Sequence, residues 1–128
     1  SKVEVVSMSV ITGSAAFINL TEHELYQGQS TGKFSLTVTL DDESIGKLEA
    51  QGVKMRTYEG SKQRKFASKY NVSIYEANGD EFMGNITRGS LVRVQYSLGD
   101  EHPVHGITPY LDKVKVLELA SGDTDEDF

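Results

Sequence analysis

The sequence FSLTVTL, which spans residues 34–40, decides the fold. From Phe34 to Leu40 every second residue is apolar, and every residue between them is Ser or Thr. Such strict alternation is typical of a β-strand, because successive side chains point to opposite faces of a sheet. The stretch therefore predicts a half-buried strand with an apolar face turned to a core and a hydroxyl face turned to solvent.

The residues that follow this strand favour a short helix. Asp41-Asp42 can accept hydrogen bonds from the first free backbone N–H groups, and Glu43 adds negative charge to the first turn. Ile45 and Leu48 then form a short apolar stripe, which ends at Gly52. These signals predict a helix of about ten residues.

Extended segments dominate the rest of the chain. Val92, Val94 and Tyr96 share one face of a strand expected over residues 91–98. Other extended segments are expected over residues 2–11, 15–20, 53–58, 63–75 and 110–119, with breaks at 12–14, 21–32 and 100–109 and a turn at 78–80. About five strands and one short helix predict an all-β domain, a small five-stranded antiparallel barrel. A β-sandwich would give the same pattern.

Length and composition narrow the class of protein. The 128 residues fit one domain, here residues 1–120, followed by a short tail over 121–128. The absence of cysteine excludes a disulfide framework and thiolate metal ligands. No apolar run approaches the roughly 18 residues of a membrane helix, and the first residues show no signal pattern. We therefore expect a soluble protein of the cytoplasm.

The distribution of charge is more informative than its sum. The formal net charge is −6, which by itself argues against nucleic acid. Residues 54–70, however, hold six basic residues and a single acid, Glu59. A local field of this kind can bind an anionic ligand, whereas the total charge mainly affects solubility and long-range steering.

The first arm of this basic segment places cations beside an aromatic ring. Period-two geometry puts Lys54, Arg56 and Tyr58 on one face. This mixture suits a single-stranded nucleic acid, because Lys and Arg neutralise phosphates and rings stack on unpaired bases. A solvated polar face beside core aromatics has the same composition. The candidate nucleic-acid-binding residues are Lys54, Arg56, Tyr58, Lys62, Arg64, Lys65, Phe66, Lys69, Tyr70, Tyr75 and Arg93.

The second arm divides into two sets by parity. Lys65, Lys69 and Tyr75 share one face if the arm is a single strand. The other face carries Arg64, Phe66, Tyr70, Val72 and Ile74. Because this second set is more apolar, we expect it to point inward, so that not every ring in the candidate set can face a ligand.

The end of the chain is acidic and closes on an aromatic residue. The residues that we expect to recognise a partner are Asp123, Asp125, Glu126, Asp127 and Phe128. A partner could take the terminal ring in a pocket and the acids on basic residues. Since residues 121–128 contain Gly122 and no apolar pattern, we expect this tail to be disordered in the free protein.

Signals for catalysis or metal binding are weak. The segment His102-Pro103-Val104-His105 suggests no third metal ligand. The acids at 41–43 could hold a divalent ion, but their place before an amphipathic stretch favours helix capping. No nucleophile–His–acid order and no glycine-rich phosphate loop is present. We therefore expect no catalytic residue, no metal and no cofactor.

Several segments occur in an order that is characteristic of one protein family. They are GKFSLTVTL at 32–40, the basic arm with Gly60, Arg64 and Phe66, GSLVRV at 89–94, GITPYLDKVKVL at 106–117, and the acidic end closed by Phe128. In this order the chain resembles the single-stranded DNA-binding replication proteins of podoviruses and related phages, an OB-fold family. The resemblance covers nearly the whole chain.

The resemblance carries expectations about structure and function. It implies an OB-type barrel that coats single-stranded DNA, without catalysis, during DNA replication, recombination or repair in the cytoplasm of an infected bacterial host. It also implies a tail that docks the phage DNA polymerase and primase-helicase, and a possible homodimer. Two other functions stay open, namely a protein-interaction module that binds no nucleic acid and a hydrolase that uses the acids at 41–43 as a metal site.

Overall fold

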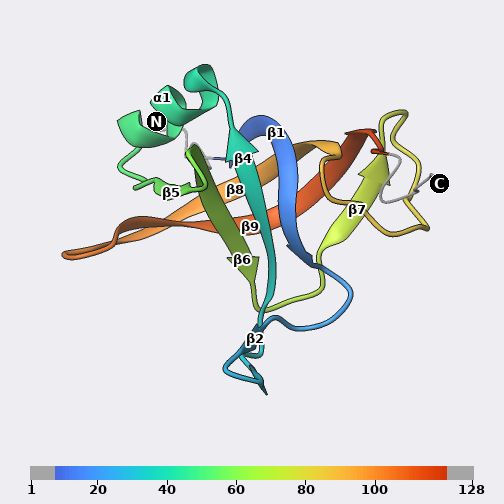
Figure 1. Ribbon diagram of the computed structural model, residues 1–128, viewed down its shortest axis with the longest axis horizontal. Coiled ribbons are helices and arrows are strands. Elements are labelled where there is room, and N and C mark those ends of the chain that lie inside the picture. Colours follow the sequence, from blue (N-terminus) through green and yellow to red (C-terminus); the bar gives the residue numbers. More distant parts are fainter. Residues whose placement is uncertain (1–7, 121–128) are drawn as a thin grey trace, which may run out of the picture.

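The computed structural model describes residues 8–120 and consists mainly of β-strands (Figure 1). In chain order the elements are β1 (Met8–Asn19), β2 (Leu25–Tyr26), β3 (Gln29–Ser30), β4 (Phe34–Leu40), α1 (Asp42–Ala50), β5 (Arg56–Tyr58), β6 (Ser61–Ser68), β7 (Ser73–Glu76), β8 (Leu91–His102) and β9 (Gly106–Glu118). The prediction of an all-β chain with one short helix is confirmed. That helix is too short to cross a membrane.

Seven strands form one sheet in the order β5-β6-β4-β1-β8-β9-β7, and β2 pairs only with β3. A parallel bridge between Ala67 and Tyr110 also joins β6 to β9. Strands β1, β4, β6, β9 and β8 therefore pair in a closed circuit, while β5 and β7 extend it at two edges. The circuit has five strands, as predicted, but β6 and β9 pair in parallel, whereas the prediction was antiparallel. Strand β5 falls within the extended segment predicted over 53–58, β7 lies at the end of the arm predicted over 63–75, and β2 and β3 lie in the segment predicted to be a loop.

The core lies inside this circuit and is formed by the inward residues of its strands. Leu36 of β4 pairs with Phe66 of β6, and both are fully buried. Phe66 also contacts Tyr96 of β8, with the ring centroids 5.3 Å apart. Every side chain on the apolar side of the stretch 34–40 is buried, as its alternation predicts.

The hydroxyl side of β4 differs from the prediction. Ser35 and Thr37 are also buried, although the sequence pattern indicated a solvent-exposed face. The segment between β1 and β4 explains the burial of Ser35, because the Ser35 hydroxyl donates a 2.8 Å hydrogen bond to Glu24 of that segment. A polar side chain can be buried at low cost when it has such a partner.

Helix α1 packs across one end of the circuit, at the upper left of Figure 1. The Asp41 carboxylate accepts a 2.8 Å hydrogen bond from the Ser44 amide, so the acids at 41–43 cap the helix as predicted. Just past the helix, Gln51 accepts a 2.6 Å hydrogen bond from the Tyr96 hydroxyl. Burial raises the pKa of this hydroxyl, which therefore stays a neutral donor.

Three segment boundaries were predicted wrongly. Strand β1 continues through residues 12–14, which were expected to break it, and residues 2–7 lie outside the described range. The arm expected over 63–75 is two strands, because the chain leaves β6 at Ser68 and starts β7 at Ser73. The expected loop at 100–109 is mostly a hairpin formed by the extended ends of β8 and β9.

Gly13 explains why β1 is not broken. A Cβ at this position would lie 2.5 Å from the Thr39 carbonyl oxygen of β4 and still closer to Cγ1 of Val38. The glycine thus permits a close approach of two strands, rather than a turn.

We expect Gly13→Ala to destabilise the fold by about 1–3 kcal/mol, because the added methyl group overpacks the contact between β1 and β4. Gly46→Ala is the matched control. Its Cβ would meet no atom within 4 Å, and alanine in a helix should stabilise by about 0.5–1 kcal/mol. Urea unfolding of both variants measures the difference. Equal stability of the two would contradict the close approach.

Candidate nucleic-acid interface

Strand register places part of the predicted basic face on the outside of the sheet. Arg56 pairs with Gln63, and Tyr58 pairs with Ser61, so Arg56 and Tyr58 share one face of β5 as predicted. Lys65 lies on that same face, two positions beyond Gln63 along β6. The side chain of Lys62 lies on the opposite face and pairs with Glu49 of α1 at 3.6 Å.

The same face continues over β4 and β1. Lys65 pairs with Thr37 of β4, and Thr37 pairs with Phe17 of β1, which forms a cross-strand row of three side chains. Phe17 reaches this outer face because the register shifts between Ala15 and Phe17 and so leaves Ala16 as an extra residue. Its ring is 38% exposed.

Aromatic rings and cations meet at this row. The rings of Phe17 and Tyr58 make an edge contact, with centroids 5.5 Å apart. The Arg88 guanidinium lies over the Phe17 ring, 5.4 Å from its centroid. Tyr58 and Arg88 also line a hollow of about 190 Å³ together with Gln63. We call the set Phe17, Arg56, Tyr58, Lys65 and Arg88 the first cationic surface.

Phe17 and Arg88 were missed by the sequence analysis. Phe17 sits in an apolar stretch, and only the extra residue before it turns its ring outward. Arg88 lies in the connection before β8, where no periodic pattern operates. A count of cations along 54–70 could find neither of them.

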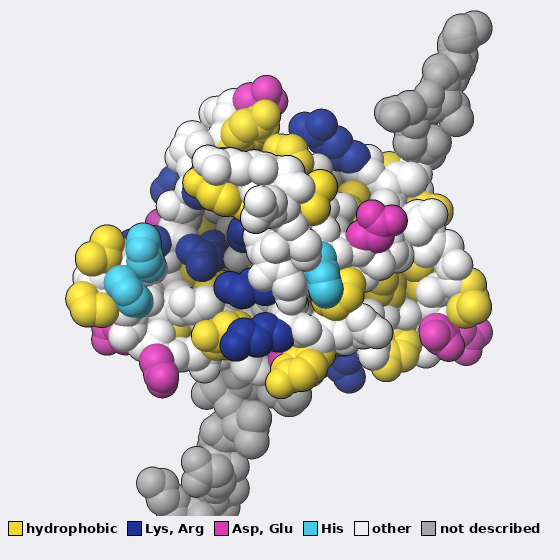
Figure 2. Space-filling model, turned by 90° about the horizontal axis from the view of Figure 1, so that it is seen from below, with side chains coloured by type: hydrophobic (Ala, Val, Ile, Leu, Met, Phe, Trp, Pro, Cys, Tyr) yellow, Lys and Arg dark blue, Asp and Glu magenta, His cyan; other side chains and the backbone are white. Residues whose placement is uncertain are grey.

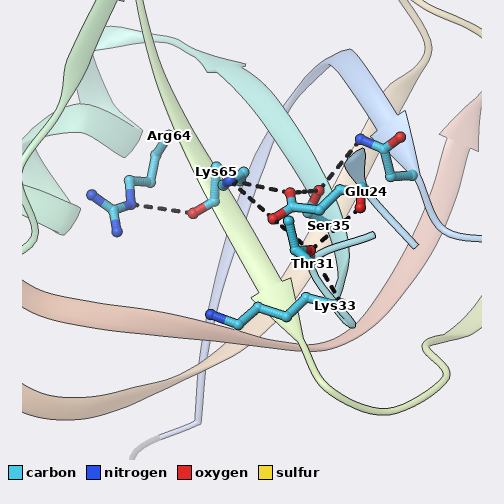
Figure 3. Close-up of polar contacts among 7 residues, drawn as sticks. Glu24, Thr31, Lys33, Ser35, Arg64 and Lys65 are labelled. Carbon is cyan, nitrogen blue, oxygen red and sulfur yellow. Dashed lines mark hydrogen bonds and ion pairs between the residues drawn. The ribbon is translucent and has the colours of Figure 1, made fainter. Parts of the chain in front are cut away.

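Lys65 is held by a carboxylate from the segment between β1 and β4 (Figure 3). Its ammonium group lies 3.1 Å from Oε1 of Glu24. That oxygen also accepts a hydrogen bond from Ser35, and Oε2 of Glu24 accepts one from Thr31. Burial alone would raise the pKa of Glu24, but the hydrogen bonds from Ser35 and Lys65 outweigh it and lower the pKa. Glu24 is therefore ionised at neutral pH and neutralises part of the charge of Lys65.

Arg64 and Lys54 lie outside the first cationic surface. Arg64 pairs with Val38, so its side chain leaves β6 on the face opposite to Lys65, as its parity predicted. Arg64 donates from Nη1 to the Lys54 carbonyl at 3.1 Å, and the Lys54 ammonium donates to the Val104 carbonyl at 2.8 Å. Burial lowers the pKa of the Arg64 guanidinium, which remains charged at neutral pH. Figure 3 shows Lys33 extending along the end of β6 on the side where Arg64 lies. From below, Lys and Arg side chains gather near the middle of the molecule (Figure 2).

Two aromatic residues of the second arm, Phe66 and Tyr70, were predicted to contact a ligand. Phe66 is fully buried in the core, so it is wrong as a ligand-binding residue, although its inward parity is confirmed. Tyr70 was expected to point inward but is 79% exposed. The strand has ended before it, and Ser68 binds the Tyr70 backbone in a local turn. Lys69 is exposed beside it.

Tyr75 and Arg93 do not belong to the first cationic surface. Tyr75 faces outward, as the parity that it shares with Lys65 predicted, but the chain turns between β6 and β7 and so places this ring on another strand. Both Tyr75 and Arg93 pair in register with Lys115 of β9, on the outer face of β7 and β8. The residues expected in the acidic tail lie outside the described residues.

Comparisons with known proteins place the fold. No family model and no curated protein sequence matches the chain. The structure of the single-stranded DNA-binding protein from bacteriophage Enc34 in complex with ssDNA matches with a TM-score of 0.70 and 10% identity, over 91% of this chain and 89% of the phage protein. For gp2.5, a single-stranded DNA-binding protein encoded by bacteriophage T7, the TM-score is 0.59 and the identity 16%, over 95% and 97% of the two chains. The chain therefore has the fold of single-stranded DNA-binding proteins from bacteriophages.

Proposed function

We propose that the circuit of β1, β4, β6, β9 and β8 is an OB-type barrel that binds single-stranded DNA, without catalysis, on the first cationic surface. One observation carries the proposal most strongly: the exposed ring of Phe17 and the half-buried ring of Tyr58 meet the cation of Arg88 on one outer face of this fold. Arg56 and Arg88 form no ion pair with any residue of the range 8–120. The likeness to phage proteins that bind single-stranded DNA supports the same ligand.

The chemistry of the face favours unpaired bases over a duplex. Bases can stack on the rings of Tyr58 and Phe17, while Arg56, Lys65 and Arg88 neutralise the phosphates on either side. In a duplex the base faces are already stacked, so only the phosphate contacts would remain. Stacking and phosphate contacts do not depend on the identity of the base, and binding should therefore tolerate any sequence.

The acidic tail fits the same role. We propose that residues 121–128 recruit replication proteins such as a phage polymerase and primase-helicase, with Phe128 as the anchor. The support is its composition, since Phe128 follows four acids and is the only large apolar residue after Ala120. A homodimer would be compatible with this arrangement.

Two cations of the first cationic surface can be removed without touching the core. We expect Arg56→Gln with Lys65→Gln to weaken binding to all single strands alike. The slope of log affinity against log salt should become shallower by about 1.4, at about 0.7 per phosphate contact. Fluorescence titration of single-stranded and duplex DNA at several salt concentrations measures both effects.

The matched control for this variant is Lys47→Gln with Lys62→Gln, which changes the net charge equally. Lys47 lies on α1 and donates to the Val10 carbonyl, and Lys62 pairs with Glu49 of α1. The proposal is wrong if both double variants keep the same salt slope, or if duplex DNA binds as tightly as single strands.

Stacking is tested at Tyr58 and Phe17. Each replacement by alanine should cost about 1–3 kcal/mol of binding free energy, because a base loses its aromatic platform. Tyr26→Ala serves as the control, since that ring is 69% exposed on β2, which pairs only with β3. Melting temperatures should stay close to that of the wild type. Normal binding by both Tyr58→Ala and Phe17→Ala would assign stacking to other rings.

The Glu24–Lys65 ion pair should restrain binding. Glu24→Gln removes a carboxylate that competes with phosphate for the Lys65 ammonium group, and it keeps an oxygen that can accept from Ser35. We expect several-fold tighter binding than in Glu22→Gln, which removes an exposed carboxylate two residues away. Titration at low salt gives the largest difference, because salt screens both interactions. Equal affinities of the two variants would show that Lys65 contacts no phosphate.

A further inference from the structure

A second set of cations lies on the outer face of β8, β9 and β7. Strand register aligns Arg93 of β8 with Lys115 of β9, and Lys115 with Tyr75 of β7. The next row places Gln95 beside Lys113 and Ser73. We call Tyr75, Arg93, Lys113 and Lys115 the second cationic surface. Neighbouring strands are about 4.8 Å apart, so the charged groups can converge on one ligand.

This surface is hollowed, and its cations form no ion pair within the described part of the chain. Tyr75, Arg93, Lys113 and Lys115 line a hollow of about 490 Å³, more than twice the volume of about 190 Å³ at the first cationic surface. None of the three cations forms an ion pair with a residue between positions 8 and 120. Three neighbouring positive charges repel one another, and a polyanion would relieve that repulsion.

An aromatic ring stands among these cations. The Lys113 ammonium group lies 5.8 Å from the centroid of the Tyr75 ring, which is only partly buried. Glu81 pairs with Tyr75 on the far edge of β7 and forms no ion pair with the lysines. Cations are therefore concentrated on the side of Tyr75 that faces β9, and the carboxylate marks the limit of the surface.

We infer that the second cationic surface binds a further stretch of the same single strand of DNA. A long strand then passes over the first cationic surface and the second on the outer side of one sheet. This inference rests on the proposed function. The two surfaces belong to one sheet and are connected by β1, whose outward residue Thr12 pairs with Arg93. The ring beside the cations favours a nucleic acid over a purely acidic segment, because bases stack on rings while phosphates take the charges.

The length of the strand separates the two surfaces in an experiment. A strand of about 6 nucleotides can fill only one surface, whereas about 16 nucleotides can cover both on one molecule, given that one OB domain occupies roughly 4–16 nucleotides. Arg93→Gln with Lys115→Gln should leave the affinity for the short strand unchanged. The same variant should bind the long strand about tenfold more weakly at low salt, with a salt slope shallower by about 1.4.

Controls keep this inference distinct from the proposed function. The net-charge control is again Lys47→Gln with Lys62→Gln, and Arg56→Gln with Lys65→Gln should weaken binding to both lengths. If the wild type binds neither length, the proposed function itself fails. If Arg93→Gln with Lys115→Gln binds the long strand as the net-charge control does, only the second cationic surface is refuted.

One further outcome would assign the surface to another ligand. A labelled peptide with the sequence of residues 121–128 should bind the wild type and Arg93→Gln with Lys115→Gln equally. Loss of peptide binding in that variant, with long-strand affinity unchanged, would make this an acceptor for an acidic segment and overturn the inference. Tyr75→Ala provides an independent check, because it should weaken only long-strand binding while the melting temperature stays close to that of the wild type.

Discussion

The pairing of Leu36 with Phe66 inside the closed circuit of strands fixes what lies outside it. Because side chains alternate, the neighbouring pair of Thr37 with Lys65 must then face outward. A slip of one residue between β4 and β6 would bury the lysine and expose the phenylalanine at the same time. Core packing therefore also positions the cations, and a separate scaffold for the ligand face is unnecessary.

Sequence alone predicted what depends on local order. The alternation at 34–40 and the capped helix after Asp41 are confirmed, because both arise from neighbouring residues. Non-local contacts could not be predicted in this way. Parity failed at Tyr70, since β6 ends at Ser68, and the burial of Ser35 depends on Glu24, a residue on another segment. Arg88 meets Phe17 only through the tertiary fold.

The same distinction between local and non-local contacts decides which charged surfaces the sequence could predict. The net charge of −6 gives no hint of two cationic faces, and the basic segment at 54–70 reveals only part of one. Lys113 and Lys115 were not recognised because an ordinary strand alternates lysine with valine in this way. Only the register with Arg93 and Tyr75 shows that these charges converge. Acids are abundant in the chain, but Glu24 is the only carboxylate among residues 8–120 that pairs with a cation of either surface.

The extra residue at Ala16 lets the two ends of β1 keep independent positions along the sheet. Before it, Ala15 pairs with Val38 on the inner face, and after it, Phe17 pairs with Thr37 on the outer face. Loss of Ala16 would make these two pairs consecutive, so the ring of Phe17 would still face outward from a regular strand. Related chains could thus differ in length at this point and still keep the exposed ring. A comparison by residue number alone would miss that equivalence.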